Sequence, residues 1–226
     1  MNDATARTAL FLLCLLLPAV AGAQTRPATM EEMHRLHQNP KEYIATLDDP
    51  ARDAYQRPVD VVKALGLKEG DVVADIGAGS GYFTFRFAHH VGASGRVYAV
   101  DVSPDMILHM NRRARDLGVD NVRTLLVPPD DPLLPSRSID HVFICDTWHH
   151  IGGHAQYLAK LSEALKPSGD VTIIDFQKKP TPVGSPPEMR VAREEVVREF
   201  ERNGFRLAGE HTFLPYQYFL TFTLAR

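Results

Sequence analysis

The chain has 226 residues, with 25 basic and 28 acidic side chains, a formal net charge of −3 and 44% hydrophobic residues. This composition is that of an ordinary globular protein and excludes a disordered, collagen-like or coiled-coil chain. The near-neutral balance argues against a protein that coats nucleic acid through its charge, and two cysteines are too few for a disulfide framework.

The first 23 residues predict an export signal. An unbroken apolar run covers residues 9–17, and the small residues Ala21 and Ala23 favour cleavage after Ala23. Residues 9–23 fall short of the roughly 20 residues that a membrane-spanning helix needs. We therefore expect a periplasmic or secreted protein with no stable membrane span after signal cleavage. The alternative is an uncleaved segment that anchors the protein to a membrane.

The rest of the chain divides into a small cap and a main domain. Residues 24–64 predict an N-terminal helical cap, because prolines separate short amphipathic stretches there. Residues 65–226 then predict one domain of a size that buries a single hydrophobic core.

Short apolar strands alternate with helices from residue 71 onward. We predict strands at residues 72–76, 97–100, 123–127, 141–145 and 171–175, and helices at residues 82–91, 104–117, 154–165 and 189–202. Apolar strands separated by helices are typical of a doubly wound, mostly parallel α/β sheet. Residues 205–211 and 216–224 are two further strands without room for a crossover helix, which predicts an antiparallel hairpin at the sheet edge.

A glycine loop between the first strand and the next helix is the most informative motif. It reads Asp-Ile-Gly-Ala-Gly-Ser-Gly-Tyr over residues 75–82. In an open α/β sheet, ligands bind at the carboxyl ends of the strands, and a helix N-terminus offers unpaired N–H groups to an anion. The Gly-x-Gly-x-Gly spacing differs from the Gly-x-Gly-x-x-Gly of dinucleotide folds. The loop by itself leaves the ligand open.

Acidic residues follow the next two strands. Asp101 ends the second strand, where a carboxylate can accept the ribose hydroxyls of an adenosine-type ligand. The alternative role of Asp101 is a helix N-cap, which Ser103 can also provide. Asp130 and Asp131 follow the third strand, and either can accept a hydrogen bond from the exocyclic amine of adenine. The alternative is a solvated acidic loop.

Together these motifs resemble the class I S-adenosylmethionine-dependent methyltransferases. The resemblance covers nearly all of the chain after the signal, from about residue 56 to residue 226. It is strongest for the small-molecule type, such as the ubiquinone/menaquinone C-methyltransferases and the arsenite methyltransferases. The matching segments are VVADIGAGSGYFT, VYAVDVSPDM, SIDHVFICDTWHHI and LKPSGDVTIIDF. The resemblance implies a Rossmann-like sheet of seven strands and S-adenosyl-L-methionine as the methyl donor.

The resemblance also implies roles for the cofactor-binding residues. The methionine part of the cofactor is expected against the residues of the glycine loop, which are Asp75, Gly77, Ala78, Gly79, Ser80 and Gly81. Asp101 is expected to hold the ribose, and Val102 and Met106 to pack against the adenine. Asp130 or Asp131 is expected to meet the adenine amine. Gln56 or Arg57, just upstream, is a candidate for the cofactor carboxylate.

The candidate catalytic residues follow the fourth strand. Asp146, His149 and His150 lie at the carboxyl end of a central strand, beside the expected methyl position. A histidine there can deprotonate a methyl acceptor, and the alternative is that both histidines merely fill the loop. His150 and His154 share a helical spacing but lack further ligands, so no metal site is expected.

Two other functions fit parts of the pattern. A nicotinamide-dependent oxidoreductase would also use a glycine loop and an acidic residue, although the glycine spacing and the terminal hairpin count against it. A non-catalytic module that binds S-adenosylmethionine would keep the same pocket. We expect a small-molecule methyl acceptor and no nucleic-acid partner. The acceptor atom, the oligomeric state and the source of S-adenosylmethionine outside the cytoplasm are left open by the sequence.

Overall fold

The computed structural model describes residues 29–225, so the predicted export signal lies outside the described residues. The strands of this part are β1 Val72–Ile76, β2 Arg96–Asp101, β3 Val122–Leu126, β4 Ile139–Cys145, β5 Leu165–Phe176, β6 Phe205–His211 and β7 Gln217–Leu224. The α-helices are α1 Met30–His37, α2 Pro40–Leu47, α3 Asp53–Gln56, α4 Pro58–Leu65, α5 Thr84–Val91, α6 Pro104–Leu117, α7 His154–Ala164 and α8 Arg193–Arg202. Short 3₁₀ helices are η1 Pro50–Arg52, η2 Trp148–His150 and η3 Pro187–Met189.

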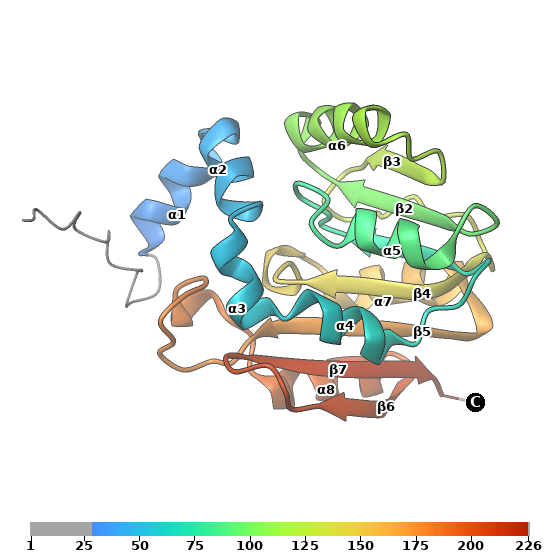
Figure 1. Ribbon diagram of the computed structural model, residues 1–226. Coiled ribbons are helices and arrows are strands. Elements are labelled where there is room, and N and C mark those ends of the chain that lie inside the picture. Colours follow the sequence, from blue (N-terminus) through green and yellow to red (C-terminus); the bar gives the residue numbers. More distant parts are fainter. Residues whose placement is uncertain (1–28, 226) are drawn as a thin grey trace, which may run out of the picture.

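The strands form one seven-stranded sheet in the described part of the chain, in the order β3-β2-β1-β4-β5-β7-β6 (Figure 1). The first five strands are parallel, and β7 is antiparallel to both β5 and β6. The predicted doubly wound, mostly parallel α/β fold with a C-terminal antiparallel pair is confirmed. β7 is inserted between β5 and β6, so only β6 of that hairpin lies at the sheet edge.

Both faces of the sheet are buried, as the continuous apolar strands predicted. Val142 of β4 belongs to a core that includes Leu158 of α7 and Phe200 of α8. The next residue, Phe143, belongs to the opposite core with Val61 of α4 and Phe87 of α5. Successive side chains of a strand point to opposite faces, so a strand covered on both faces is apolar at every position. Figure 1 shows α4 and α5 on one side of the sheet and α7 and α8 on the other.

The helix predicted over residues 189–202 is shorter than expected. α8 begins at Arg193, and Pro187–Met189 forms the separate turn η3. Arg190 and Ala192 between them have extended backbones, with ψ of 141° and 143°. The side chain of Arg190 is buried in contacts with a neighbouring loop, and these contacts hold the chain away from helical geometry.

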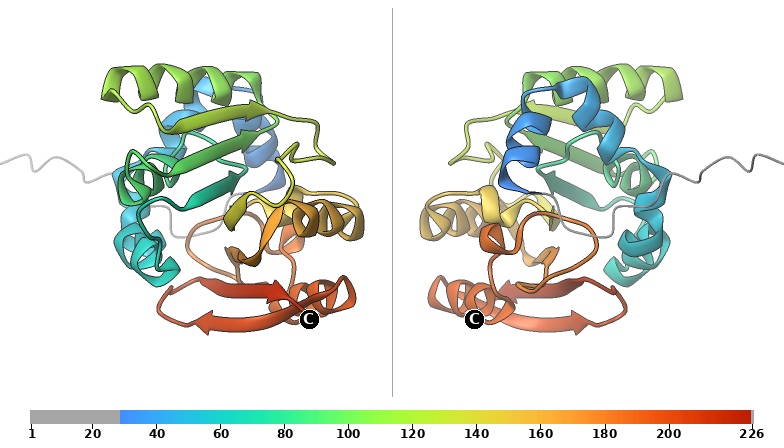
Figure 2. Two further views of the ribbon diagram at one scale, coloured as in Figure 1. Left: turned by 90° about the vertical axis from the view of Figure 1, so that its right-hand side faces the viewer. Right: turned by 90° about the vertical axis from the view of Figure 1, so that its left-hand side faces the viewer.

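The N-terminal helices lie across the carboxyl ends of the parallel strands. In Figure 1 the arrowheads of β2 and β4 point toward α1, α2 and α3, and the right-hand view of Figure 2 looks onto this edge. Ser80 of the glycine loop donates a hydrogen bond to Asp48, at the end of α2 (2.7 Å). These helices therefore cover the edge of the sheet at which the sequence predicts a bound ligand. No helix among the described residues is long and apolar enough to cross a membrane.

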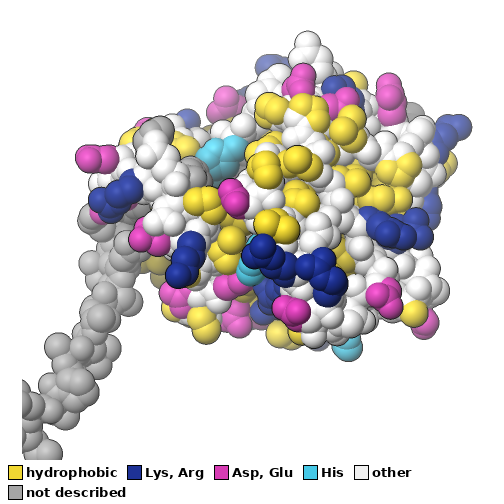
Figure 3. All heavy atoms as spheres, turned by 90° about the horizontal axis from the view of Figure 1, so that it is seen from above, with side chains coloured by type: hydrophobic (Ala, Val, Ile, Leu, Met, Phe, Trp, Pro, Cys, Tyr) yellow, Lys and Arg dark blue, Asp and Glu magenta, His cyan; other side chains and the backbone are white. Residues whose placement is uncertain are grey.

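Apolar side chains are exposed where the sheet ends at β3. Figure 3 looks down on this end of the molecule and shows hydrophobic side chains gathered there. Leu108 and Leu117 of α6 and Leu126 of β3 are each about half exposed. β3 is an edge strand, so nothing in the sheet covers these leucines on that side.

His141, near the amino end of the central strand β4, lies between Asp71, just before β1, and Asp170 of β5. We expect this arrangement to make the stability of the fold depend on pH. Its ring nitrogens lie 3.3 Å from Asp71 and 3.1 Å from Asp170. Burial alone would lower the pKa of His141, but the hydrogen bond and charge of Asp170, helped by Asp71, raise it above the ordinary 6.5. Because the pKa of His141 is higher in the folded than in the unfolded state, the protonated histidine stabilises the fold. This contribution is complete below pH about 6.5, and it is lost as the pH rises through the folded-state pKa.

We expect His141→Gln to lower the free energy of unfolding by about 1.5 kcal/mol at pH 5.5 and by less at pH 9. Urea unfolding at both pH values measures the difference. His90→Gln is the control, because this exposed histidine bonds the carbonyl of Arg86 and faces the ring of His89 but pairs with no carboxylate that the structure describes. It should cost little at either pH. An equal loss at both pH values for His141→Gln would contradict the charged pairing.

Candidate functional site

A large cleft of about 1140 Å³ lies at the carboxyl ends of β1, β2 and β4. The N-terminal helices form one wall of it, and the loops after β4 and β5 form the other. Most of the predicted site residues line this cleft. They are Asp75, Gly77, Ala78, Gly79, Ser80, Asp101, Val102, Met106, Asp146, His149 and His150. Gly81, Asp130 and Asp131 do not line it.

The glycine loop brings the backbone close to its neighbours. Gly77 has a φ of +68°, and a Cβ added there would lie 2.3 Å from the side chain of Thr147. A Cβ on Gly79 would lie 2.9 Å from Leu47 of α2. Gly81, in contrast, packs against Phe85 and Met110 beneath the loop. The loop is therefore compressed between the β4 loop and the N-terminal helices, and glycine is required for that packing.

Three N–H groups of the glycine loop are already engaged within the fold. Gly77 and Ala78 both donate to the carbonyl of Val100, at 2.8 and 3.0 Å, and Gly79 donates to Asp101 Oδ2 at 2.8 Å. The helix after the loop begins only at Thr84. The loop can shape a ligand surface and offer its carbonyls and dipoles, but these three amides are already used within the fold.

Asp101 stands at the tip of β2 with both carboxylate oxygens engaged. Oδ2 accepts the N–H of Gly79, and Oδ1 accepts the N–H of Ser103 at 2.9 Å. Burial raises the pKa of Asp101, and these backbone hydrogen bonds oppose the rise. Ser103 is the N-cap of α6, so the capping role that was the alternative for Asp101 belongs to Ser103. A carboxylate has about four acceptor positions, so Asp101 keeps acceptor capacity for a ligand.

The acidic loop does not reach the cleft with its carboxylates. Asp131 accepts the N–H of Leu133 and pairs with Lys160, both at 2.9 Å, and these contacts lower its pKa. Lys160 also donates to the carbonyl of Asp130. The cleft wall in this region is made by Val127, Pro128 and Pro129. The predicted contact with an adenine amine is therefore not preformed in either aspartate.

Asp146 lies half-buried just after β4, in an uncommon backbone conformation. Its φ is +52°, which is uncommon for a residue with a side chain. Oδ1 accepts a hydrogen bond from Gln217 Nε2 at 2.7 Å, and Oδ2 lies 3.8 Å from Arg52 Nη2. Burial, together with the charge of Asp175, raises the pKa of Asp146 to about 6.

His149 and Asp175 form a buried pair between the loops after β4 and β5. His149 Nδ1 lies 2.8 Å from Asp175 Oδ2, with 2% of the histidine side chain and none of the aspartate side chain exposed. Asp175 Oδ1 accepts the N–H of Phe176, which fixes the carboxylate. Burial opposes the charged imidazole, but Asp175 outweighs it and raises the pKa of His149 above 6.5. Because Nδ1 is occupied, Nε2 is the nitrogen left for proton transfer in the cleft.

His150 and His154 do not join this pair as metal ligands. His150 is exposed at the cleft, with its ring 4.2 Å from that of His149. His154 stacks on Trp148 and pairs with Glu199 at 2.9 Å. No group of three or more potential metal ligands occurs among the residues that the structure describes.

Several cleft residues were missed by the sequence interpretation. Arg52 lines the cleft, with its guanidinium 4.3 Å from the Tyr82 ring, whereas Gln56 is buried against Cys145 and Arg57 pairs with Asp60 at the surface. Arg52 therefore lines the cleft, whereas the two candidates named from the sequence, Gln56 and Arg57, do not. Tyr43 of α2 is also in the wall, and burial and the charge of Asp101 raise its pKa to about 12. Nothing in a helical sequence pattern marks such residues in advance.

Asp175 had a signal that the sequence interpretation did not use. It ends the apolar run of β5, just as Asp101 ends that of β2 and Asp146 follows that of β4. Parallel neighbours such as β4 and β5 end at the same edge of a sheet, so their terminal acids lie together.

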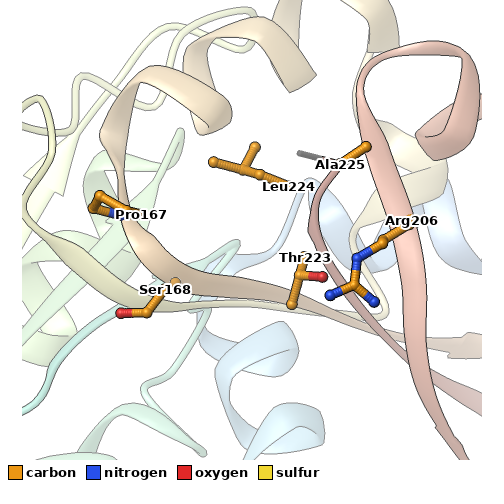
Figure 4. A pocket seen from close by; sticks show the side chains of 7 residues that line it. Pro167, Ser168, Arg206, Thr223, Leu224 and Ala225 are labelled. Atoms are coloured by element: carbon orange, nitrogen blue, oxygen red, sulfur yellow. The ribbon is translucent and has the colours of Figure 1, made fainter.

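A smaller hollow of about 390 Å³ lies away from the cleft (Figure 4). It is lined by Pro167 and Ser168 of β5, Arg206 of β6 and Thr223 and Leu224 of β7. Arg206 and Thr223 are opposite each other in the sheet, and Figure 4 shows their side chains side by side. None of the predicted site residues borders this hollow, so the cleft is the candidate site.

Gly77 provides a test of the packing that shapes the cleft. We expect Gly77→Ala to lower the free energy of unfolding by about 3 kcal/mol, because backbone strain adds to the collision with Thr147. Gly118→Ala is a matched control, since Gly118 also has a positive φ (+63°) but no atom lies within 4 Å of the added Cβ. Gly118→Ala should cost about 1–2 kcal/mol. If both variants lose the same free energy of unfolding in urea, the close approach to Thr147 does not contribute to the cost of Gly77→Ala.

Comparison with known proteins identifies similar chains. Residues 67–207 match a family model described as a methyltransferase domain. Ubiquinone/menaquinone biosynthesis C-methyltransferases of Pasteurella multocida and Psychromonas ingrahamii are 29% and 28% identical over 118 and 126 residues. Those matches cover 52% and 55% of this chain and 44% and 49% of the relatives. The chain thus spans about half the length of the curated relatives it matches.

Solved structures extend the similarity over more of the chain. An S-adenosylmethionine-dependent methyltransferase from Aquifex aeolicus is 31% identical, with a TM-score of 0.78, over 83% of this chain and 99% of its own. A 1,6-didemethyltoxoflavin-N1-methyltransferase from Burkholderia thailandensis, solved with S-adenosylhomocysteine, is 20% identical. Its TM-score is 0.58 over 88% of this chain and 92% of its own, a similarity of fold.

Proposed function

The chain belongs to the S-adenosylmethionine-dependent methyltransferase family, and we propose that it methylates a small acceptor whose reacting atom loses a proton to His149. When bound, S-adenosylmethionine supplies a methyl group attached to a cationic sulfur. The rest of the molecule is the leaving group and becomes a neutral thioether. The protein then has to align the acceptor, exclude water and accept the acceptor's proton. The buried His149–Asp175 pair is the observation that carries this proposal.

The cleft fits S-adenosylmethionine in its nucleoside half. Asp101 retains acceptor positions that suit two ribose hydroxyls. Beyond it, Val102 is 56% exposed, and Met106 and Val127 also line the cleft. An exposed valine between a carboxylate and an apolar wall is a surface that an adenine ring can cover.

A cation and an anion lie side by side where the amino-acid half of S-adenosylmethionine would bind. Arg52 and Asp146 both line the cleft, and Arg52 Nη2 lies 3.8 Å from Asp146 Oδ2. This separation is long for a direct ion pair, so both groups keep capacity for a zwitterion. We assign Arg52 to the carboxylate of the methionine part and Asp146 to its ammonium group. Asp146 then acts in cofactor binding rather than as a base.

The acceptor side of the cleft is apolar and aromatic. The rings of Tyr55 and Phe176 lie 6.0 Å apart, and those of Tyr55 and Tyr216 lie 6.4 Å apart. Phe176 and His149 line the same cleft, so this aromatic surface borders the space that the base faces. A planar acceptor can pack on these rings with its O–H, N–H or S–H group toward His149. Apolar walls also exclude water from the reaction.

Calorimetry and a methyl-transfer assay test the proposal together. We expect S-adenosylmethionine and S-adenosylhomocysteine to bind and NADH not to bind, and labelled methyl groups to reach at least one compound in a panel of phenols, amines and thiols. Binding of NADH alone would favour a nicotinamide-dependent oxidoreductase. Binding of S-adenosylmethionine without transfer to any acceptor would favour a non-catalytic binding module.

We also propose that the protein acts outside the cytoplasm after removal of residues 1–23. The basis is the apolar run and the small residues before Gln24. N-terminal sequencing of fractionated protein tests this. A periplasmic chain that starts at Gln24 is expected, and a cytoplasmic chain that still starts at Met1 would refute export. A membrane-bound chain with an intact N-terminus would instead indicate an anchor.

A further inference from the structure

The side chain of Arg190 is enclosed by backbone carbonyls beside the cleft. It is 1% exposed, although arginine is rarely buried without a carboxylate. Nε donates to the carbonyl of Ser185 at 2.7 Å, and Nη1 donates to those of Gln177 and Lys179 at 2.9 and 2.6 Å. Nη2 donates to Val183 at 3.4 Å and again to Ser185. All five N–H donors of the guanidinium are therefore used, and every acceptor is main chain.

These carbonyls belong to one irregular loop, residues 177–185, which follows β5. The loop has no regular structure of its own, and Arg190 bonds to it near both ends. The guanidinium also lies 5.0 Å from the centre of the Phe176 ring. Gly184 has a φ of +94°, and a Cβ added there would lie 2.5 Å from the same ring. Arg190 and Gly184 thus hold Phe176 between them.

The loop held by Arg190 is one wall of the cleft. Pro182, Val183, Gly184 and Ser185 line the cleft together with Phe176. His149 lines the same cleft as Phe176, and the charge of Arg190 is among those that act on it. The cofactor contacts at Asp101 and Arg52 come from other elements. Arg190 therefore shapes the acceptor side of the cleft and leaves the cofactor side to the rest of the molecule.

We propose that Arg190 is a positioning residue for the methyl acceptor, because its five hydrogen bonds hold the 177–185 loop as the acceptor wall. This inference rests on the proposed methyl transfer. Arg190 makes no contact with the reacting atoms in this role and acts through Phe176 and the loop. A lysine keeps the positive charge but has three donors at a single atom, so it cannot bridge the two ends of the loop.

The test compares Arg190→Lys with Arg193→Lys, since Arg193 lies three residues on and pairs with Glu210 at the surface. Hydrogen exchange of the cofactor-free protein is measured first. We expect amides of residues 177–185 to exchange at least about tenfold faster in Arg190→Lys than in the wild type or the control. Unchanged exchange in these residues would overturn the proposal. This measurement needs no acceptor, so its result is independent of the proposed function.

Kinetics with an acceptor found in the panel gives the second measurement. We expect Arg190→Lys to raise the KM for the acceptor about tenfold, with kcat and the Kd for S-adenosylhomocysteine each within about threefold of wild type. Gly184→Ala, which displaces Phe176 while keeping the Arg190 side chain in the protein, should raise the same KM. A loss of S-adenosylhomocysteine affinity with unchanged acceptor KM would overturn the acceptor role. A wild type that methylates nothing would refute the proposed function and this acceptor role, while the exchange result would still decide whether Arg190 holds the loop.

Discussion

Replacing His149 by Gln is expected to lower kcat by about 10²–10⁴-fold, because the general base of methyl transfer is then lost. Glutamine is close in size and keeps a polar group beside Asp175, so the cofactor Kd should change little, although loss of the buried charged pair should lower the free energy of unfolding. Single-turnover methyl transfer to an acceptor from the panel measures the effect. His150→Gln is the paired variant. If it causes the greater loss, the base has been assigned to the wrong histidine.

The pH dependence of the rate gives an independent check on the same pair. The base must be neutral, so the rate falls as the pH drops through the pKa of His149, which Asp175 raises above 6.5. Asp175→Asn removes that carboxylate and leaves burial, which lowers the pKa of His149. The acid limb should therefore move to lower pH, while kcat also falls because the imidazole loses its orienting partner. The other charges that act on His149 are Asp146 and Arg190, and they stay in place. An acid limb that does not move would contradict the pair.

Asp101→Ala is expected to weaken S-adenosylhomocysteine binding by about 10–100-fold. The ribose hydroxyls would lose a charged acceptor, and hydrogen bonds to charged groups contribute about 1.5–3 kcal/mol. The same change removes the acceptor for the N–H groups of Gly79 and Ser103, so the free energy of unfolding should also fall by about 1–3 kcal/mol. Calorimetry and urea unfolding measure the two effects separately.

Asp105→Asn is the matched control for this prediction. Asp105 lies on the first turn of α6, four residues along the chain, and is exposed and outside the cleft. It should leave the affinity for S-adenosylhomocysteine within about twofold. If Asp101→Ala also leaves that affinity unchanged while the stability falls, Asp101 only holds the glycine loop and does not bind the ribose.

The fold could be predicted from local sequence, because hydrophobic periodicity and turn residues determine helices and strands over short stretches of the chain. The strand at 72–76 and the helix at 104–117 were predicted with the bounds that the structure has. The glycine loop and Asp101 were recognised for a similar reason, since they sit at set positions within one strand–loop–helix unit. Whether they bind S-adenosylmethionine remains a prediction. The start of α8 was misplaced because the contacts of Arg190 come from a loop that a helical pattern does not include.

By itself, the sequence determined the doubly wound sheet, the sheet edge at which the cleft lies and the resemblance to the family. Each of these follows from patterns in neighbouring residues. Only the tertiary structure decided which side chains meet at that edge. It paired His149 with Asp175, brought Arg52 of the N-terminal helices beside Asp146, and left Asp130 and Asp131 outside the lining of the cleft. These contacts join residues that are far apart in the chain. Local sequence does not show which distant residues meet, because burial and packing in the folded protein decide it.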